Sequence, residues 1–93
     1  MQVRREALGS FRTFEGHAAR VMKRYGGAIE RTVVLAAAAA SEIHEEVHLV
    51  RFPSAEAFEA YRADPEIAAV RHLRDESVIA TDVARGEDGP EYG

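Results

Sequence analysis

The apolar residues between Leu8 and Tyr25 recur at steps of three and four, which places them on one stripe of an amphipathic helix. The stripe consists of Leu8, Phe11, Phe14, Ala18, Val21, Met22 and Tyr25. The charged residues between them are typical of a solvated face: Arg12, Glu15, Arg20, Lys23 and Arg24. Gly26-Gly27 follows directly, and a glycine just past the last stripe residue is a common helix stop. The pattern predicts a helix over about residues 6–25.

Two later segments have the composition of β-strands. Residues 29–35 alternate, with Ile29, Val33 and Leu35 on one side. Residues 46–52 are rich in Val, Leu and Phe and end at Pro53, which stops a strand or a helix alike. Between them, the small residues 36–41 are compatible with a helix or with a plain connection.

A second helical region follows Pro53. Ser54 is suited to cap a helix that carries Phe58 and Tyr61. The helix restarts at Asp64-Pro65-Glu66, because Asp caps, Pro fits the first helical position and Glu favours the positive end of the helix dipole. The apolar stripe of this second piece is Ile67, Val70 and Leu73.

The predicted order of elements is α-β-β-α-β, closed by a short strand over residues 78–84 and preceded by the stub Met1 to Arg5. A ferredoxin-like fold is β-α-β-β-α-β, so its first strand is either short and formed by the stub, or lies upstream of this chain. We expect a single α+β domain over residues 1–86 and an acidic, flexible tail over residues 87–93.

Composition excludes several classes of protein. Twelve Lys and Arg against 16 Asp and Glu give a net charge of −4, which argues against nucleic-acid binding through phosphate neutralisation. The absence of cysteine removes disulfides, thiolate catalysis and cysteine-bound metal. The longest apolar run, residues 33–40, is far shorter than a membrane helix, and the N-terminus does not read as a signal peptide. We therefore expect a soluble, cytoplasmic protein, small enough to gain from burying surface against a second copy.

Three short motifs carry a resemblance to a known family: Phe52-Pro53-Ser54, Tyr61 with Asp64-Pro65-Glu66, and Leu73-Arg74. They resemble a family of small uncharacterised bacterial proteins in the dimeric α/β-barrel superfamily, whose relatives include antibiotic-biosynthesis monooxygenases, polyketide cyclases and muconolactone isomerases. The resemblance implies a ferredoxin-like subunit, with two helices on one face of an antiparallel sheet. It also implies a homodimer that pairs its sheets, and a pocket between sheet and helices.

The chain departs from this family at two places. Its first strand is short or missing, and Ile67 stands where the family often has an aromatic residue. Tyr61 falls at the place of a pocket tyrosine of the cyclases, but the histidine that works with that tyrosine would fall near Ile67. The cyclase mechanism therefore does not carry over whole.

The segment His44-Glu45-Glu46-Val47-His48 matches the H-E-x-x-H zinc motif. On a helix the two histidines could share a zinc ion, with Glu45 as general base and a third ligand from His72 or Glu66. On a strand, His44 and His48 would point to the same side but lie about 13 Å apart, too far for one metal ion. The strand-like continuation of the segment favours a chance match.

Strand alternation places His48 on one face with Val50 and Phe52, and Arg51 on the other face. His48 could act as an acid or base near neutral pH, or could simply be hydrogen-bonded in a wall. Arg51 could hold a substrate carboxylate through its fork of donors, or form a salt bridge at an edge or a dimer interface.

Four further side chains are candidates for ligand binding. Tyr25 and Tyr61 each end an apolar stripe, and their hydroxyls could orient a ligand or simply be hydrated. On the last helix, His72 and Arg74 lie in a positive strip that could attract an anionic metabolite or form a solvated face. Arg74 is the stronger candidate, because it falls on the Leu-Arg pair of the resemblance.

Three hypotheses about function follow. The first is a homodimer that binds a small organic metabolite through Tyr61, His48 and Arg74, without a cofactor and with acid–base or monooxygenase- or cyclase-type chemistry. The second is a non-catalytic dimeric module of structural or stress-associated role. The third is a small zinc hydrolase that uses His44 and His48.

Overall fold

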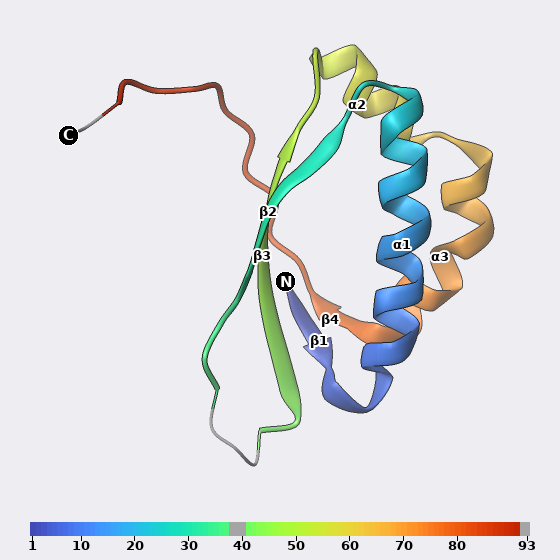
Figure 1. Ribbon diagram of the computed structural model, residues 1–93. Helices are drawn as coiled ribbons and strands as arrows, with labels where there is room; N and C mark the ends of the chain where they lie inside the picture. The colour runs from blue at the N-terminus through green and yellow to red at the C-terminus, as the bar shows by residue number, and fades with distance from the viewer. Residues whose placement is uncertain (38–40, 92–93) are drawn as a thin grey trace.

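An antiparallel sheet forms one layer of the computed structural model, which describes residues 1–37 and 41–91 (Figure 1). Within these residues the strands are β1 (Gln2–Arg4), β2 (Ala28–Val34), β3 (Ile43–Arg51) and β4 (Val78–Ala80), in the spatial order β2-β3-β1-β4. In the short β1, Val3 is paired with His44 of β3 and Val78 of β4. The stub at the start of the chain thus forms a short strand inside the sheet, which is one of the two predicted alternatives.

Three α-helices of the described residues form the second layer, on one face of the sheet (Figure 1). A 3₁₀ turn (Arg5–Ala7) leads into α1 (Leu8–Arg24), and α2 (Ala55–Arg62) is followed by α3 (Pro65–Ser77). The ferredoxin-like expectation of two helices on this face is therefore wrong in number, but the predicted restart at Asp64 is confirmed. The second helical region is broken at Asp64, whose side chain accepts a hydrogen bond from the Glu66 backbone N–H (2.8 Å) and starts a new helix.

Gly26 and Gly27 are each needed for a different physical reason. Gly26 has φ of +74°, a left-handed conformation that ends α1 and that other residues rarely adopt. At Gly27 a Cβ atom would lie 2.3 Å from Cε1 of Phe52, so only glycine lets this ring pack on the backbone. The two glycines join α1 to β2 and lie against Pro53 and Phe52, which follow the end of β3.

The apolar core lies between the sheet and the helices. It consists of Phe14, Ala18, Val21, Met22, Tyr61 and Ile67, with Phe52 and Phe58 packed against it. Five of the seven residues predicted for the α1 stripe are buried: Phe11, Phe14, Ala18, Val21 and Met22. The amphipathic pattern therefore predicted correctly which face of α1 meets the sheet.

Two predicted strand boundaries are wrong. β3 begins at Ile43 rather than at 46, because residues 43–45 pair with β1. β4 ends at Ala80 rather than at 84, because β1 supplies only three residues for it to pair with. Residues 81–91 have no regular secondary structure, and the predicted tail of residues 87–93 extends beyond the described residues. Ala36 and Ala37 also lack regular structure, and the rest of the alanine run, residues 38–40, lies outside the described part.

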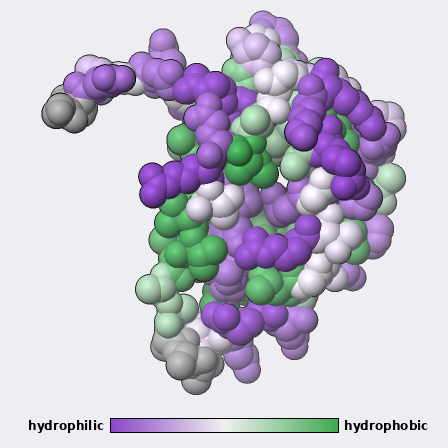
Figure 2. All heavy atoms as spheres, in the orientation of Figure 1, coloured by the Kyte–Doolittle hydropathy of each residue, from purple (hydrophilic) through white to green (hydrophobic). Residues whose placement is uncertain are grey.

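The face of the sheet turned away from the helices carries exposed apolar residues of β2 and β3 beside charged ones such as Arg31, the β2 partner of Leu49, and no helix of the described residues covers it (Figure 1). Val47 and Leu49 of β3 are 52% and 58% exposed there, and Val33 of β2 is paired with Val47. We call this surface the open face and define it by its exposed apolar residues Val33, Ile43, Val47, Leu49 and Ile79. Figure 2 shows apolar side chains gathered along the outer side of β2 and β3. In residues 1–37 and 41–91, no helix has the length and apolar character needed to cross a membrane.

Candidate functional site

Alternation along β3 turns His44, Glu46 and His48 toward the helices. Glu46 is fully buried, His44 is 7% exposed, and the side chain of His48 is 11% exposed. Phe52 continues the same face and packs against the apolar core. His48 lies on the predicted face of β3, whereas Phe52, predicted as the last residue of the strand, follows it because β3 ends at Arg51.

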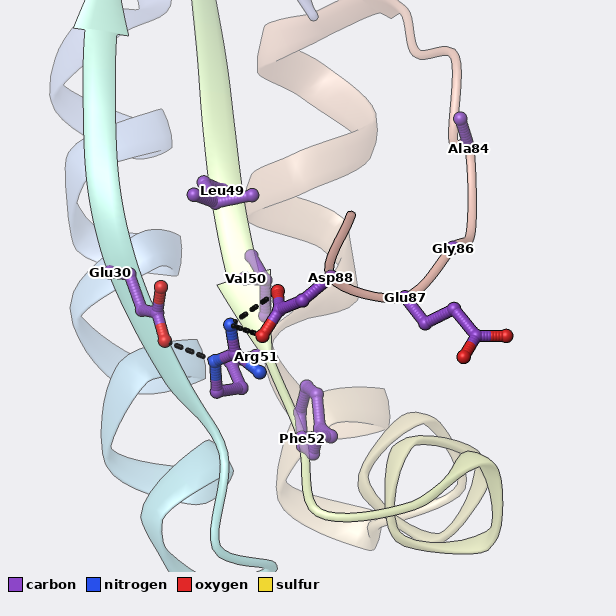
Figure 3. A pocket seen from close by; sticks show the side chains of 9 residues that line it. All are labelled: Glu30, Leu49, Val50, Arg51, Phe52, Ala84, Gly86, Glu87 and Asp88. Carbon is purple, nitrogen blue, oxygen red and sulfur yellow. Dashed lines mark hydrogen bonds and ion pairs between the residues drawn. The ribbon is translucent and has the colours of Figure 1, made fainter. Parts of the chain in front are cut away.

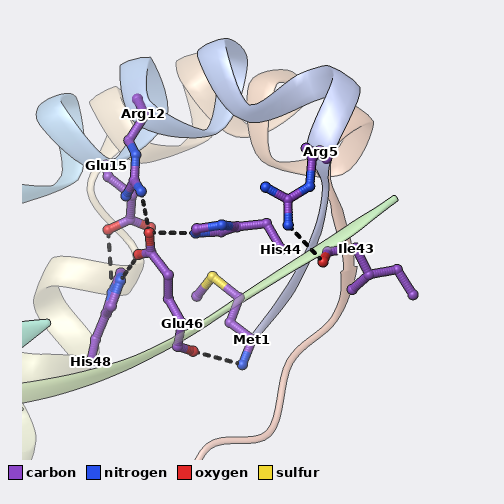
Figure 4. Close-up of polar contacts among 8 residues, drawn as sticks. All are labelled: Met1, Arg5, Arg12, Glu15, Ile43, His44, Glu46 and His48. Carbon is purple, nitrogen blue, oxygen red and sulfur yellow. Dashed lines mark hydrogen bonds and ion pairs between the residues drawn. The ribbon is translucent and has the colours of Figure 1, made fainter. Parts of the chain in front are cut away.

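The carboxylate of Glu46 is the centre of a polar cluster (Figure 4). Its Oε1 lies 2.8 Å from Nε2 of His44, and its Oε2 lies 2.7 Å from Nε2 of His48. Arg12 of α1 forms an ion pair with Oε1. We call these residues, together with Glu15, the Glu46 cluster; it joins the N-terminal half of α1 to the middle of β3.

Glu46 is ionised over the whole physiological range. Burial raises the pKa of its carboxyl, but hydrogen bonds from Arg12, His48 and His44 outweigh burial and lower the pKa to about 2. An ionised carboxylate can only accept hydrogen bonds. Both histidines therefore carry a proton on Nε2.

Glu15 of α1 is a second carboxyl group on the other side of the His48 ring. Its Oε2 lies 3.5 Å from Nδ1 of His48, and its side chain is 17% exposed. Burial raises the pKa of Glu15; His48 opposes this rise and Glu46 adds to it. The two carboxyl groups that face His48 thus have pKa values shifted in opposite directions.

Tyr61 of α2 and Arg74 of α3 interact electrostatically with Glu15. Burial, followed by the charge of Glu15, raises the pKa of Tyr61 to about 12, and Arg74 opposes that rise. Arg74 likewise opposes the rise in the pKa of Glu15. A guanidinium N–H of Arg74 also donates to Oγ1 of Thr81 (2.9 Å). The predicted residues His48, Tyr61 and Arg74 are therefore linked electrostatically through Glu15.

Arg51 lies outside the cluster. It forms salt bridges with Glu30 of β2 and with Asp88, whose carboxylate oxygens lie 2.8 and 3.0 Å from its guanidinium (Figure 3). These partners line a surface hollow of about 320 Å³ together with Leu49 and Phe52. Of the two roles considered for Arg51, a ligand for a substrate carboxylate or a partner in a salt bridge, this geometry corresponds to the salt bridge.

Two other predicted residues are also outside the cluster. Tyr25 donates a hydrogen bond to Oδ2 of Asp64 (2.6 Å) and so fastens the end of α1 to the start of α3. His72 is exposed on α3. Neither of them contributes to the arrangement around Glu46.

The helix that the zinc alternative requires is not formed, because residues 44–48 belong to β3. His44 and His48 point to the same side, as the strand interpretation predicts, but the Glu46 carboxylate lies between them and binds both rings. Among the described residues, no three His, Cys, Asp or Glu side chains are grouped so that they could hold a metal ion.

Sequence reasoning missed Arg12, Glu15 and Glu46. It assigned Arg12 and Glu15 to a solvated face, which is wrong for Glu15 because most of its side chain is buried. Helix spacing carried a signal, since Glu15 lies four residues after Phe11 and three before Ala18, both buried. Strand alternation carried a second signal, because residues two apart on a strand lie on the same face, which places Glu46 beside His48.

Comparison of the chain with models of protein families, with curated proteins and with solved structures finds no match in any of the three. The functional argument therefore rests on the geometry of the Glu46 cluster and of the open face.

Proposed function

We propose that this chain is a ferredoxin-like subunit of a homodimer that binds a small organic metabolite at the Glu46 cluster. The observation that carries this proposal is the complete burial of a charged Glu46 between the sheet and α1. Burying a carboxylate costs free energy even when it is paired, and apolar side chains of similar size often stabilise a core as well or better. A charged centre in so small a domain is thus better explained by a role in binding or chemistry.

The order of the strands supports the ferredoxin-like assignment. That fold is built from two β-α-β units whose strands interleave in one antiparallel sheet. In this chain β1 lies between β3 and β4, and β3 lies between β1 and β2, with antiparallel pairing throughout. The helices lie on one face, so a ligand enclosed by a single subunit would lie between them and the sheet.

The open face supports the homodimer. One face of a two-layer antiparallel sheet normally meets water and carries polar side chains. Here Val47 and Leu49 at its centre are more than half exposed, and Val33, Ile43 and Ile79 extend the apolar surface. Exposed apolar side chains gathered on one surface mark interaction sites, and a second copy presents the same apolar residues.

Ligand binding is tested by a thermal-shift screen of small organic acids and carbonyl compounds against the full chain. We expect a compound that raises the melting temperature of the wild type, with the rise lost in His48→Ala. The matched control is His17→Ala, which alters a histidine on α1 whose ring contacts Arg20 rather than Glu46. A ligand that stabilises His48→Ala as much as the wild type would place its site elsewhere.

The homodimer is tested by light scattering behind a sizing column. We expect a mass of about twice 10.2 kDa for the wild type. Leu49→Lys introduces a charge at the centre of the open face and should give a folded monomer. The matched control is Glu56→Lys on α2, which is exposed and lies on the helical layer. A wild-type monomer would refute the dimer.

A non-catalytic dimeric module is the second candidate, and one observation favours it. In the described part of the chain, every buried side-chain nitrogen or oxygen has a hydrogen-bond partner, so the Glu46 cluster is satisfied without a ligand. Such a network could serve only to fix α1 on the sheet. The ligand screen distinguishes the two candidates. For a structural module, no compound should raise the melting temperature in a way that is lost in His48→Ala.

A further inference from the structure

A second hollow lies where β1 ends and β3 begins. It has a volume of about 580 Å³ and is lined by Arg4, Arg5, Glu6, Glu42, Ile43 and Ile79. We call it the arginine hollow. Its volume lies in the range of pockets that bind small molecules. None of its residues belongs to the Glu46 cluster, and the side chain of Ile43 points away from that cluster (Figure 4).

Arg5 is fixed at the wall of the arginine hollow by the backbone at the start of β3. Its Nε donates to the carbonyl of Ser41 (2.8 Å), which also lines the hollow, and its Nη2 donates to the Ile43 carbonyl (3.4 Å) (Figure 4). Its backbone N–H donates to the Glu42 carbonyl (2.9 Å). Three consecutive carbonyls thus hold Arg5, which reduces the side-chain entropy that is lost when a ligand binds.

Arg4 is the second guanidinium of the hollow. Its Nη1 donates to the backbone carbonyl of Glu76, in the last turn of α3 (3.4 Å). In the part of the chain that the structure describes, the side chains of Arg4 and Arg5 donate only to backbone carbonyls and form no ion pair. A guanidinium has five N–H donors, so both groups keep donors for an anion. A carboxylate presents two oxygens that match this fork.

Glu6 and Glu42 place two negative charges in the same hollow. Within residues 1–37 and 41–91 neither of them forms an ion pair, so the four charged side chains of the hollow are not paired with one another. A ligand with only a negative charge would be repelled by the two glutamates. A ligand with a negative and a positive charge would attract both kinds of side chain.

Ile43 and Ile79 give the hollow an apolar side. Their side chains are 38% and 44% exposed, so each has apolar surface that a ligand can cover. Covering this surface with an apolar group removes it from water and favours binding.

We propose that the arginine hollow binds a free α-amino acid with an apolar side chain. The two guanidinium groups hold its carboxylate, the two glutamates hold its ammonium group, and the two isoleucines contact its side chain. This class of ligand carries an anion, a cation and an apolar body in one small molecule. The site lies within one subunit and requires neither the homodimer nor a ligand at the Glu46 cluster. L-Leucine is the probe we choose.

The ligand class is tested by titrating the isotope-labelled full chain with L-leucine and following its amide signals by NMR. We expect saturable shifts centred on residues 4–6, 41–43 and 79. Two analogues each lack one charge: 4-methylpentanoate has no ammonium group, and L-leucinamide has no carboxylate. Both should bind about tenfold more weakly, because each loses hydrogen bonds to charged groups. Equal binding of L-leucine and 4-methylpentanoate, or shifts that do not saturate, would overturn the proposal.

The arginines are tested by variants in the same titration. Arg4→Gln and Arg5→Gln should each weaken the binding of L-leucine about tenfold. The matched control is Arg71→Gln, an exposed arginine of α3 outside the hollow, which should leave binding unchanged. Arg4→Gln is the decisive variant if Arg5→Gln loosens the backbone at Ser41, because Arg4 donates only to the end of α3. Unchanged binding in a folded Arg4→Gln would overturn the site.

The glutamates are tested by the double variant Glu6→Gln/Glu42→Gln, which should weaken the binding of L-leucine but not that of 4-methylpentanoate. His48→Ala and Leu49→Lys should bind L-leucine as the wild type does. Failure of the ligand screen at the Glu46 cluster, or of the homodimer, is thereby distinguished from failure of this site. A loss of L-leucine binding in a folded His48→Ala would overturn the assignment to the arginine hollow.

Discussion

Glu46→Gln removes the buried negative charge on which three donors converge, while it nearly preserves the volume of the side chain. The pKa of Glu46 is lowered from its ordinary value of 4.5 to about 2 in the folded chain. Because the folded value lies below the ordinary one, the ionised carboxylate stabilises the fold above about pH 4.5. That contribution is lost as the pH falls from about 4.5 towards 2.

The difference between the two values corresponds to about 3 kcal/mol of unfolding free energy. Glu46 itself is fully buried, but the side chain of its partner Arg12 is 47% exposed, so solvent weakens that part of the interaction. We therefore expect Glu46→Gln to lower the free energy of unfolding by about 2–3 kcal/mol at pH 7. At pH 2 the variant and the wild type should differ little.

Urea denaturation followed by circular dichroism, from pH 2 to pH 7, measures this difference. Glu15 acts in the opposite direction, because its raised pKa makes the fold gain stability when Glu15 is protonated. The comparison is therefore also made in a Glu15→Gln background, which removes this opposing titration. A loss of stability that is the same at pH 2 and pH 7 would show that packing, not charge, explains the role of Glu46.

Three smaller perturbations test the surrounding structure, each by urea denaturation. Gly27→Ala should cost about 1–3 kcal/mol because its Cβ collides with Phe52, and the added substitution Phe52→Ala should remove the collision and with it the extra cost of the alanine. Asp64→Ala should cost about 1–2 kcal/mol, since it removes the N-cap of α3; a cost near zero would contradict that role. Asp88→Asn should leave the urea midpoint nearly unchanged, because its salt bridge with Arg51 is exposed, and a clear loss of stability would show that residues 81–91 are part of the fold's core.

The elements that could be predicted from the sequence are those specified by local chemistry. Gly26-Gly27 ends a helix wherever it follows an apolar stripe, and Asp64-Pro65 starts one, because both act through the backbone of their own neighbourhood. β1 and β4 are three residues long, which is too short for alternation to be visible. β1 forms because it pairs with β3, and β4 forms because it pairs with β1. These partners lie far away in the sequence, so the local pattern does not reveal them.

The candidate site was predictable only in part, for a related reason. The face on which His48 lies could be predicted, because the alternation of side chains along a strand depends on that strand alone. The partners of His48 come from two elements, and charged residues such as Glu15 are usually solvated. Only the packing of α1 on β3 shows that Glu15 and Glu46 face each other across the His48 ring.

Each face of the sheet departs in one respect from what a stable two-layer fold needs. The covered face has a charged carboxylate at its centre, and the uncovered face has exposed valine and leucine. An isolated subunit would be more stable with an apolar side chain in place of Glu46 and polar side chains on the open face. Burial lowers the free energy of apolar side chains, whereas contact with water lowers that of charged ones. Stability of one subunit therefore explains neither departure. The proposed second copy on the open face would account for the apolar residues, and the proposed ligand beside His48 would account for Glu46, so the two departures support the same proposal independently.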